Sequence, residues 1–140
     1  MKRSQSLYVL LALAMSVSAC SNGSTSGTTV TPAAPTVTET FPGTVSYLGT
    51  DFHPFTVGQG GTVNVTLTAA GPPPTIWMGL GIGTPSTTTC ALIQGDTTPT
   101  PGATTAQLSG SLSAGTYCVQ VYDVGNLLAP ITYSVTVAHT

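Results

Sequence analysis

Charged residues are nearly absent from this 140-residue chain. Only 4% of its residues are Asp, Glu, Lys or Arg, and Lys2 and Arg3 are its two basic residues, whereas about 25% charged residues is usual in soluble proteins. This lack excludes nucleic-acid binding, because neutralising phosphates requires a basic patch. Strong helix formers are also scarce, since Gly, Pro and Thr stand where Glu and Lys are usual. A helical bundle is therefore not expected.

The hydrophobic fraction of 41%, combined with a net charge of only −2, argues against a chain that is disordered throughout. The first 20 residues have the organisation of a secretory signal: a basic start, an apolar run over residues 7–17 and small residues before Cys20. The apolar run is shorter than the roughly 20 residues that a transmembrane helix needs.

Residues 17–20 read Val-Ser-Ala-Cys and resemble the lipobox of bacterial lipoproteins. In that family the Cys is diacylated through its sulfur and becomes the new N-terminus. The resemblance implies a signal peptide over residues 1–19 and a lipid bilayer as partner, reached through acylated Cys20. Ser21 after the Cys favours the outer membrane, by similarity to the sorting pattern of enterobacteria. An ordinary signal peptide with a chance Cys is the alternative.

Residues 20–40 comprise this Cys and a Ser/Thr/Gly/Pro-rich tether. Removal of residues 1–19 would take away both basic residues and leave four acids, which are Glu39, Asp51, Asp96 and Asp123. Any binding by the mature chain would then rest on apolar contact, aromatic stacking and neutral hydrogen bonds.

Three cysteines are an odd number for a secreted protein until one is assigned to lipid. The remaining two, Cys90 and Cys118, are predicted to form a disulfide, because thiols in small domains outside the cytoplasm usually pair. Closing this loop is worth roughly 3 kcal/mol. A metal site is the alternative, but no His lies near either Cys in the sequence.

From residue 41 onward, short segments of alternating apolar and polar residues are separated by Gly and Pro. The alternation is strict over residues 63–68, 117–122 and 131–137, and weaker over residues 52–57, 76–82 and 106–112. Alternation of this kind predicts an all-β domain over residues 41–140, an antiparallel β-sandwich of seven to eight short strands. The predicted core consists of Val63, Val65, Leu67, Ile76, Met78, Leu80, Tyr117, Val119, Val121, Tyr133, Val135 and Val137.

Three segments of this region resemble the bacterial pre-peptidase C-terminal domain. Residues 60–67 are similar to its glycine turn and "G-x-V-x-V-x-L" strand, residues 112–121 to its "L-x-A-G-T-Y-x-V-x-V" hairpin, and residues 133–137 to its final "Y-x-V-x-V" strand. The resemblance implies a domain that aids secretion or binds insoluble protein or glycan beside a secreted hydrolase. This chain differs in having no enzyme attached and in lacking the acidic cluster of calcium-binding relatives, since Glu39 stands alone in the linker.

No catalytic constellation is recognisable, so we expect neither an enzyme nor a cofactor or metal. His53 is a candidate base oriented by Asp51, but a strand-edge His with an exposed imidazole is the favoured interpretation. His139 is next to the last residue and is expected to fray. Asp123 belongs to a segment that is better explained as a hairpin turn than as a calcium loop.

The candidate ligand-binding residues are Trp77 and Tyr122. If Met78 and Leu80 point inward, Trp77 points outward beside glycines, and Tyr122 is outward if Val121 is in the core. An exposed, uncharged aromatic surface suits stacking of carbohydrate or apolar protein. Two structural alternatives are that Trp77 covers the glycines and a neighbouring strand, or that it covers the Cys90–Cys118 disulfide.

The sequence thus predicts a membrane-anchored envelope lipoprotein with a non-catalytic binding module whose ligand is a glycan or a protein. A purely structural envelope component without a specific ligand is the alternative, and an accessory subunit of a secreted hydrolase is a more remote one.

Overall fold

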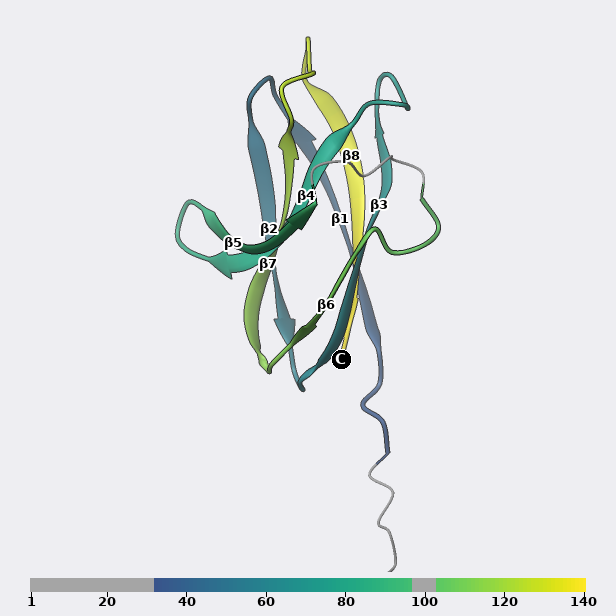
Figure 1. The fold of residues 1–140 in the computed structure, drawn as a ribbon, viewed down its shortest axis with the longest axis vertical. Coiled ribbons are helices and arrows are strands. Elements are labelled where there is room, and N and C mark those ends of the chain that lie inside the picture. The colour runs from purple at the N-terminus through teal and green to yellow at the C-terminus, as the bar shows by residue number, and fades with distance from the viewer. Residues whose placement is uncertain (1–31, 97–102) are drawn as a thin grey trace, which may run out of the picture. The chain divides into compact units, whose positions relative to one another are not determined.

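A computed structural model describes residues 32–96 and 103–140 of the chain. The expected signal peptide, Cys20 and most of the tether lie outside the described residues. The described part is an all-β sandwich of two antiparallel four-stranded sheets, which confirms the predicted fold class (Figure 1). No helix long and apolar enough to cross a membrane is found within residues 32–96 and 103–140.

The eight strands divide equally between the two sheets. The first sheet has the order β1-β8-β3-β6 and the second has the order β2-β7-β4-β5. Their bounds are β1 Val37–Val45, β2 Thr50–Val57, β3 Gly61–Gly71, β4 Met78–Pro85, β5 Cys90–Asp96, β6 Leu108–Leu112, β7 Gly115–Asp123 and β8 Ile131–His139.

The alternating residues of both sheets meet in one apolar core, as expected for half-buried strands. Ten of the twelve predicted core residues are buried, and the other two, Ile76 and Tyr117, are partly buried and pack against the core. The compact unit Pro32–Thr140 contains this core and all eight strands, so we expect residues 32–140 to fold without the preceding residues.

Strands β1 and β5 were not among the segments predicted from alternation. β1 begins at Val37, four residues before the expected domain boundary, and contains Pro42, which is tolerated because β1 lies at a sheet edge. β5 loses its alternation at a bulge: Leu92 pairs with Gly83 and Gln94 with Ile82, so the residue between them has no partner across the ladder.

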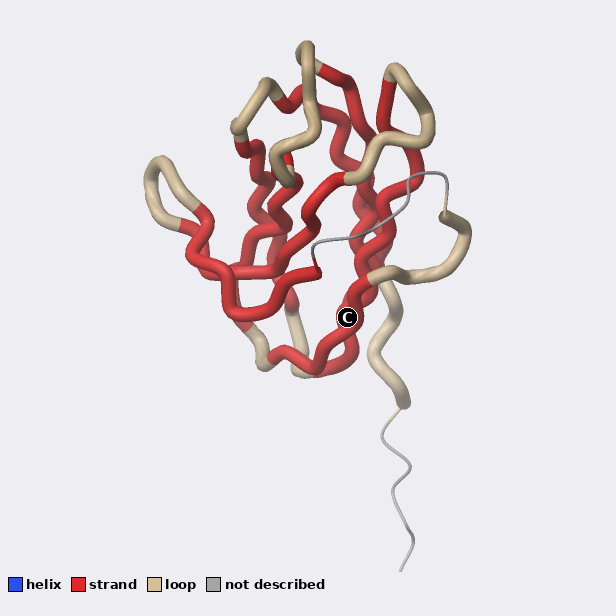
Figure 2. Tube along the Cα trace, turned by 45° about the horizontal axis from the view of Figure 1, so that its top comes forward, coloured by secondary structure: helices blue, strands red, loops and turns tan. Residues whose placement is uncertain are grey.

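The strands run between the two ends of the sandwich. The loops β1–β2, β3–β4 and β7–β8 lie together at one end, and β1 begins at the other end, beside the C-terminus and the turns β2–β3 and β6–β7 (Figures 1 and 2). We call the first end, formed by residues 46–49, 72–77 and 124–130, the loop end.

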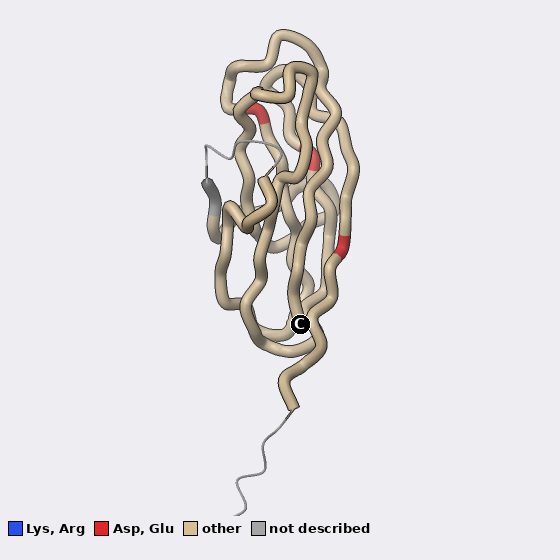
Figure 3. Tube along the Cα trace, turned by 90° about the vertical axis from the view of Figure 1, so that its right-hand side faces the viewer, with Lys and Arg blue, Asp and Glu red and all other residues tan. Residues whose placement is uncertain are grey.

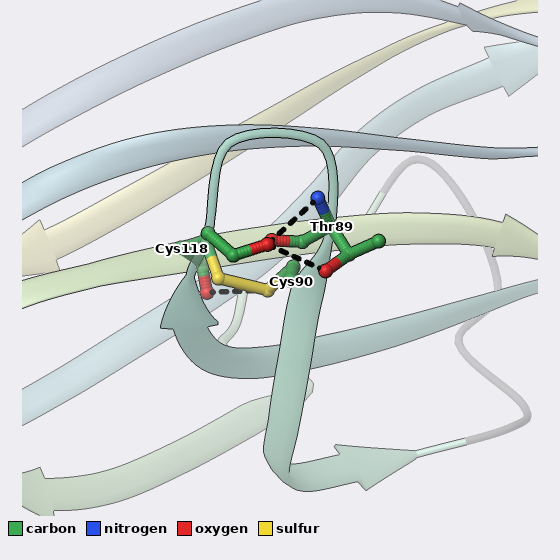
Figure 4. Close-up of a disulfide and its surroundings, with 4 residues drawn as sticks. Thr89, Cys90 and Cys118 are labelled. Carbon is green, nitrogen blue, oxygen red and sulfur yellow. Dashed lines mark hydrogen bonds between the residues drawn. A yellow bond between two sulfur atoms is a disulfide. The ribbon is translucent and has the colours of Figure 1, made fainter.

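The predicted disulfide between Cys90 and Cys118 is confirmed, with a Cα–Cα distance of 6.0 Å (Figure 4). It joins β5 to β7, which are not neighbours in the sheet, because β4 lies between them. The Cys90 sulfur is also 3.6 Å from the Cys118 carbonyl oxygen, a contact without a hydrogen bond because a disulfide sulfur has no proton to donate. Beside it, a turn at Ser86 and Thr89 is closed by a hydroxyl–hydroxyl hydrogen bond of 2.7 Å.

Candidate functional site

The outer face of the β2-β7-β4-β5 sheet carries both candidate ligand-binding residues. Tyr122 in β7 faces outward, because its neighbour Val121 is in the core, and its partner across the ladder is Gly79 of β4. Trp77 directly precedes β4, two residues before Gly79. Extending the alternation of β4 by one residue to Trp77, which lies outside the strand, places Trp77 on the same side of the sheet as Tyr122. Trp77 is 50% exposed.

The glycines of β4 are already covered by side chains other than Trp77. A Cβ atom at Gly79 would overlap the ring of Tyr122, and a Cβ at Gly81 would overlap the side chain of Leu92. Both glycines are therefore needed for close approach of a neighbouring side chain. Tyr122 and Leu92 perform the covering role that one structural alternative assigned to Trp77.

The second structural alternative, in which Trp77 covers the disulfide, also disagrees with the register. Cys118 pairs with Gly83, whereas Trp77 lies before Met78, the first residue of β4. The disulfide is thus at the opposite end of this strand. Trp77 is half exposed and is not among the atoms nearest to Gly79 or Gly81.

No charged side chain faces outward from β2 or β7 on this sheet. Among the described residues there is no Lys or Arg, and the acids are few and separate (Figure 3). Asp51 and Asp123 occupy inward-facing positions, opposite Val121 and Met78 respectively. The outward positions of these two strands are Thr50, Phe52, Pro54, Thr56, Thr116, Cys118, Gln120 and Tyr122.

The loop end is a second apolar surface, which the sequence did not predict as a site. It carries five of the eight large hydrophobic side chains that are exposed in the described structure: Tyr47, Leu48, Trp77, Val124 and Leu128. They come from three loops that are separated by up to 80 residues in the chain, so only the fold brings them to one end.

Asp123 holds two of these loops in place. Its Oδ2 accepts a hydrogen bond of 2.8 Å from the N–H of Leu48, and its Oδ1 accepts bonds of 2.8, 3.0 and 3.2 Å from the N–H groups of Gly125, Asn126 and Leu127. The residue is only 9% exposed. The predicted hairpin turn is therefore present, but it is built around a buried carboxylate.

The same contacts set the ionisation of Asp123. Its burial acts to raise the pKa, but the hydrogen bonds from Leu48 and from the three β7–β8 loop N–H groups together lower the pKa below its ordinary value. The carboxylate form is thus the one that the fold stabilises.

We expect this carboxylate to make stability depend on pH. Because its pKa is lower in the folded state than in the unfolded state, its contribution is fully present above about pH 4 and is lost as pH falls through the folded-state pKa. Urea unfolding measured from pH 7 to pH 2 checks this. In Asp123→Asn, the free energy of unfolding should depend less on pH in the acid range. An unchanged pH dependence in this variant would contradict the role given to the Asp123 carboxylate.

A pocket of about 220 Å³ lies at the loop end between the β3–β4 and β7–β8 loops. Apart from one side chain, Asn126, its lining is apolar: Pro72, Pro73, Ile76, Leu127, Leu128, Ala129 and Ile131. The pocket lining and the exposed side chains of the loop end are thus both largely apolar.

His53 belongs to a polar cluster between β2 and β8, where the sequence predicted an exposed imidazole. That prediction is wrong: the side chain is 26% exposed, its ring stacks on Phe41 at 5.0 Å between centroids, and its Nε2 lies 2.9 Å from the Tyr133 hydroxyl. The same hydroxyl donates a 2.9 Å hydrogen bond to Asp51. Burial and this carboxylate raise the pKa of Tyr133 far above its usual value, so the phenol stays protonated and acts as a donor.

His139 does not fray, contrary to expectation. It ends β8, is 4% exposed, and its Nε2 lies 2.9 Å from a carboxylate oxygen of Glu39. Glu39 is in turn part of β1 and not of a linker, and its strand partner is Val137. A histidine next to the last residue is ordered here because β8 is an inner strand paired on both sides.

The described residues contain no group of three or more His, Cys, Asp or Glu side chains placed to hold a metal ion. The candidate surfaces for neutral contacts with a ligand are the outer face with Trp77 and Tyr122 and the loop end.

No family model and no curated protein matches the sequence. Among solved structures, the chain is similar to a crystal structure of Aeromonas hydrophila PliG, a periplasmic inhibitor of g-type lysozyme, with 17% identity and a TM-score of 0.49. The match covers 71% of this chain and 83% of that one. At this level of similarity, nothing about the function of that protein passes to this chain.

Proposed function

We propose that this chain is a bacterial envelope lipoprotein, anchored through acylated Cys20 in the outer membrane, whose sandwich is a non-catalytic binding module. The outer face bearing Trp77 and Tyr122 is the proposed binding surface, and its ligand is an uncharged glycan or an apolar protein surface. One observation carries this proposal: Trp77 is half exposed on an uncharged face, while the neighbouring glycines are covered by Tyr122 and Leu92. Aromatic rings left open in this way stack on sugars and apolar groups.

Trp77→Ala tests the binding role. We expect the variant to lose retention on insoluble polysaccharide or cell-wall preparations, while its free energy of unfolding changes by less than about 0.5 kcal/mol, because an exposed side chain contributes little. Binding by the wild type should persist at high salt, since no cation takes part. Tyr47→Ala, which removes an exposed aromatic ring at the loop end, is the matched control and should bind normally.

The opposite pattern supports the structural alternative. If Trp77→Ala leaves polysaccharide retention unchanged but lowers the free energy of unfolding by about 1–3 kcal/mol, Trp77 is a structural residue and the binding module is rejected.

Cys20→Ala tests the anchor. The wild type should incorporate labelled fatty acid, sediment with membranes and have the mass of a chain cleaved before residue 20, because two or three acyl chains hold a protein on a bilayer almost permanently. The variant should lose the label and the membrane association. The double variant Cys90→Ala/Cys118→Ala is the control and should keep both. Membrane sedimentation of Cys20→Ala in undiminished amount would reject the lipid anchor.

A further inference from the structure

The loop end presents an unusual combination of side chains for a surface in water. Tyr47, Leu48, Val124 and Leu128 are exposed on two of its loops, and the residues of all three loops include no Lys, Arg, Glu or exposed Asp. We propose that the loop end is a bilayer-contact site, in which these side chains enter the interfacial region of an electrically neutral lipid membrane. This site is separate from the lipid anchor and, apart from Trp77 at its rim, from the outer face proposed above to bind a glycan or a protein.

The chemistry of the protruding residues fits the membrane interface. Tyr and Trp place an apolar ring in the boundary region and keep a polar group at headgroup level, and leucines reach into the acyl region. The absence of basic residues removes attraction to anionic headgroups, so the structure favours zwitterionic lipid.

Several backbone N–H groups of the loop end are already hydrogen-bonded within the protein, which lowers the cost of moving this backbone out of water. The N–H groups of Leu48, Gly125, Asn126 and Leu127 already bond to the carboxylate of Asp123, and the N–H of Ile76 bonds to a carbonyl at 3.1 Å. Four further positions, 72–74 and 130, are prolines and have no N–H. These bonds and prolines reduce the number of N–H groups that insertion would leave without partners, and such unpaired groups are a main cost of placing irregular backbone in a membrane.

The shape of the loop end favours a bilayer over a protein partner. Leu128 is 101% exposed and Leu48 is 66% exposed, so each side chain projects from its loop and is not part of a flat patch. Protein interfaces bury a continuous, closely complementary surface. A fluid bilayer instead closes around separate projections, and each inserted side chain contributes independently of the others.

Vesicle binding by residues 32–140, which contain neither the signal nor Cys20, tests the site. The probe is a vesicle of phosphatidylcholine and phosphatidylethanolamine, and binding is followed by cosedimentation. Trp77, the single tryptophan of the chain, lies at the rim of the loop end, so its emission should shift to the blue on binding. We expect the same partition coefficient at low and high salt. No cosedimentation, or cosedimentation with anionic vesicles alone, would overturn the proposal.

Leu48→Gly combined with Leu128→Ser tests which residues carry the binding. Leu48 has a φ of 52°, a left-handed conformation that glycine adopts freely, and Leu128 is fully exposed, so the unfolding midpoint should not fall. We expect the vesicle partition coefficient to drop at least about tenfold, because two buried leucine side chains are lost. Ile93→Ser, which removes an exposed aliphatic side chain from β5, is the control and should bind as the wild type does.

Three outcomes of the variant experiment are informative. Wild-type partitioning by the double variant, or an equal loss in Ile93→Ser, would reject the loop end as the contact. Retention on polysaccharide should be the same in the double variant as in the wild type. A loss of vesicle binding with normal polysaccharide retention therefore separates this site from the binding face proposed above.

Discussion

Replacing Asp123 by alanine is expected to lower the free energy of unfolding by about 4 kcal/mol, the largest effect of any single side chain outside the core. The carboxylate accepts four backbone hydrogen bonds that join the β1–β2 loop to the β7–β8 loop. Hydrogen bonds to a charged group are worth about 1.5–3 kcal/mol each, and truncation also leaves buried donors unpaired. Urea unfolding at pH 7 measures the loss.

The two oxygens of Asp123 serve different loops, which gives a finer test. In Asp123→Asn, the amide oxygen can keep the three bonds that Oδ1 accepts, while the NH2 group faces the N–H of Leu48. We expect a loss of about 2 kcal/mol and faster hydrogen exchange at Leu48 than at residues 125–127. Asp51→Ala, which removes a half-buried carboxylate with one strong partner, is the control and should cost about 1 kcal/mol. Equal losses in the three variants would contradict this account.

Removing the disulfide is expected to lower the free energy of unfolding by about 3 kcal/mol, because a cross-link between residues 28 apart restricts the unfolded chain. The comparison is between the wild type and Cys90→Ala/Cys118→Ala in urea. Titration of denatured, unreduced protein should find neither thiol free. Two reactive thiols, or a double variant as stable as the wild type, would contradict the prediction.

The disulfide should also have a local effect, because of where it crosses the sheet. It passes from β7 to β5 over Gly83 of β4, where an added Cβ would crowd the Cys90 sulfur. β5 is an edge strand whose ladder partner is β4 alone. In the double variant, hydrogen exchange should therefore increase in β5 more than in β7, which is paired on both sides.

The sandwich and most of its core followed from alternation, because half-buried strands impose a period of two on the sequence. The disulfide followed from counting cysteines in a chain expected to carry a secretory signal. The alternation was broken by Pro42 in an edge strand and by the bulge in β5, so β1 and β5 were not predicted. The outward direction of Trp77 was predictable from its neighbours, but the covering of Gly79 by Tyr122 was not, since it depended on the register of β7 against β4.

The loop end could not be predicted because its residues are distant in the sequence. Single exposed hydrophobic residues such as Leu48 and Leu128 are ordinary in loops, and only the fold gathers them. Asp123 gave a weak signal, as the first residue of an Asp-Val-Gly-Asn segment. Such a segment indicates a turn, but not that the carboxylate also reaches a loop 75 residues away.

The pairing of β1 with β8 determines how the domain responds to mechanical pulling. β1 follows the tether and pairs with β8 over all nine of its residues, from Val37 opposite His139 to Val45 opposite Ile131. When the domain is held at its loop end and pulled through the tether, the load runs along the strands, so the ladder hydrogen bonds are sheared together and do not open one after another. We therefore expect a high unfolding force in single-molecule stretching.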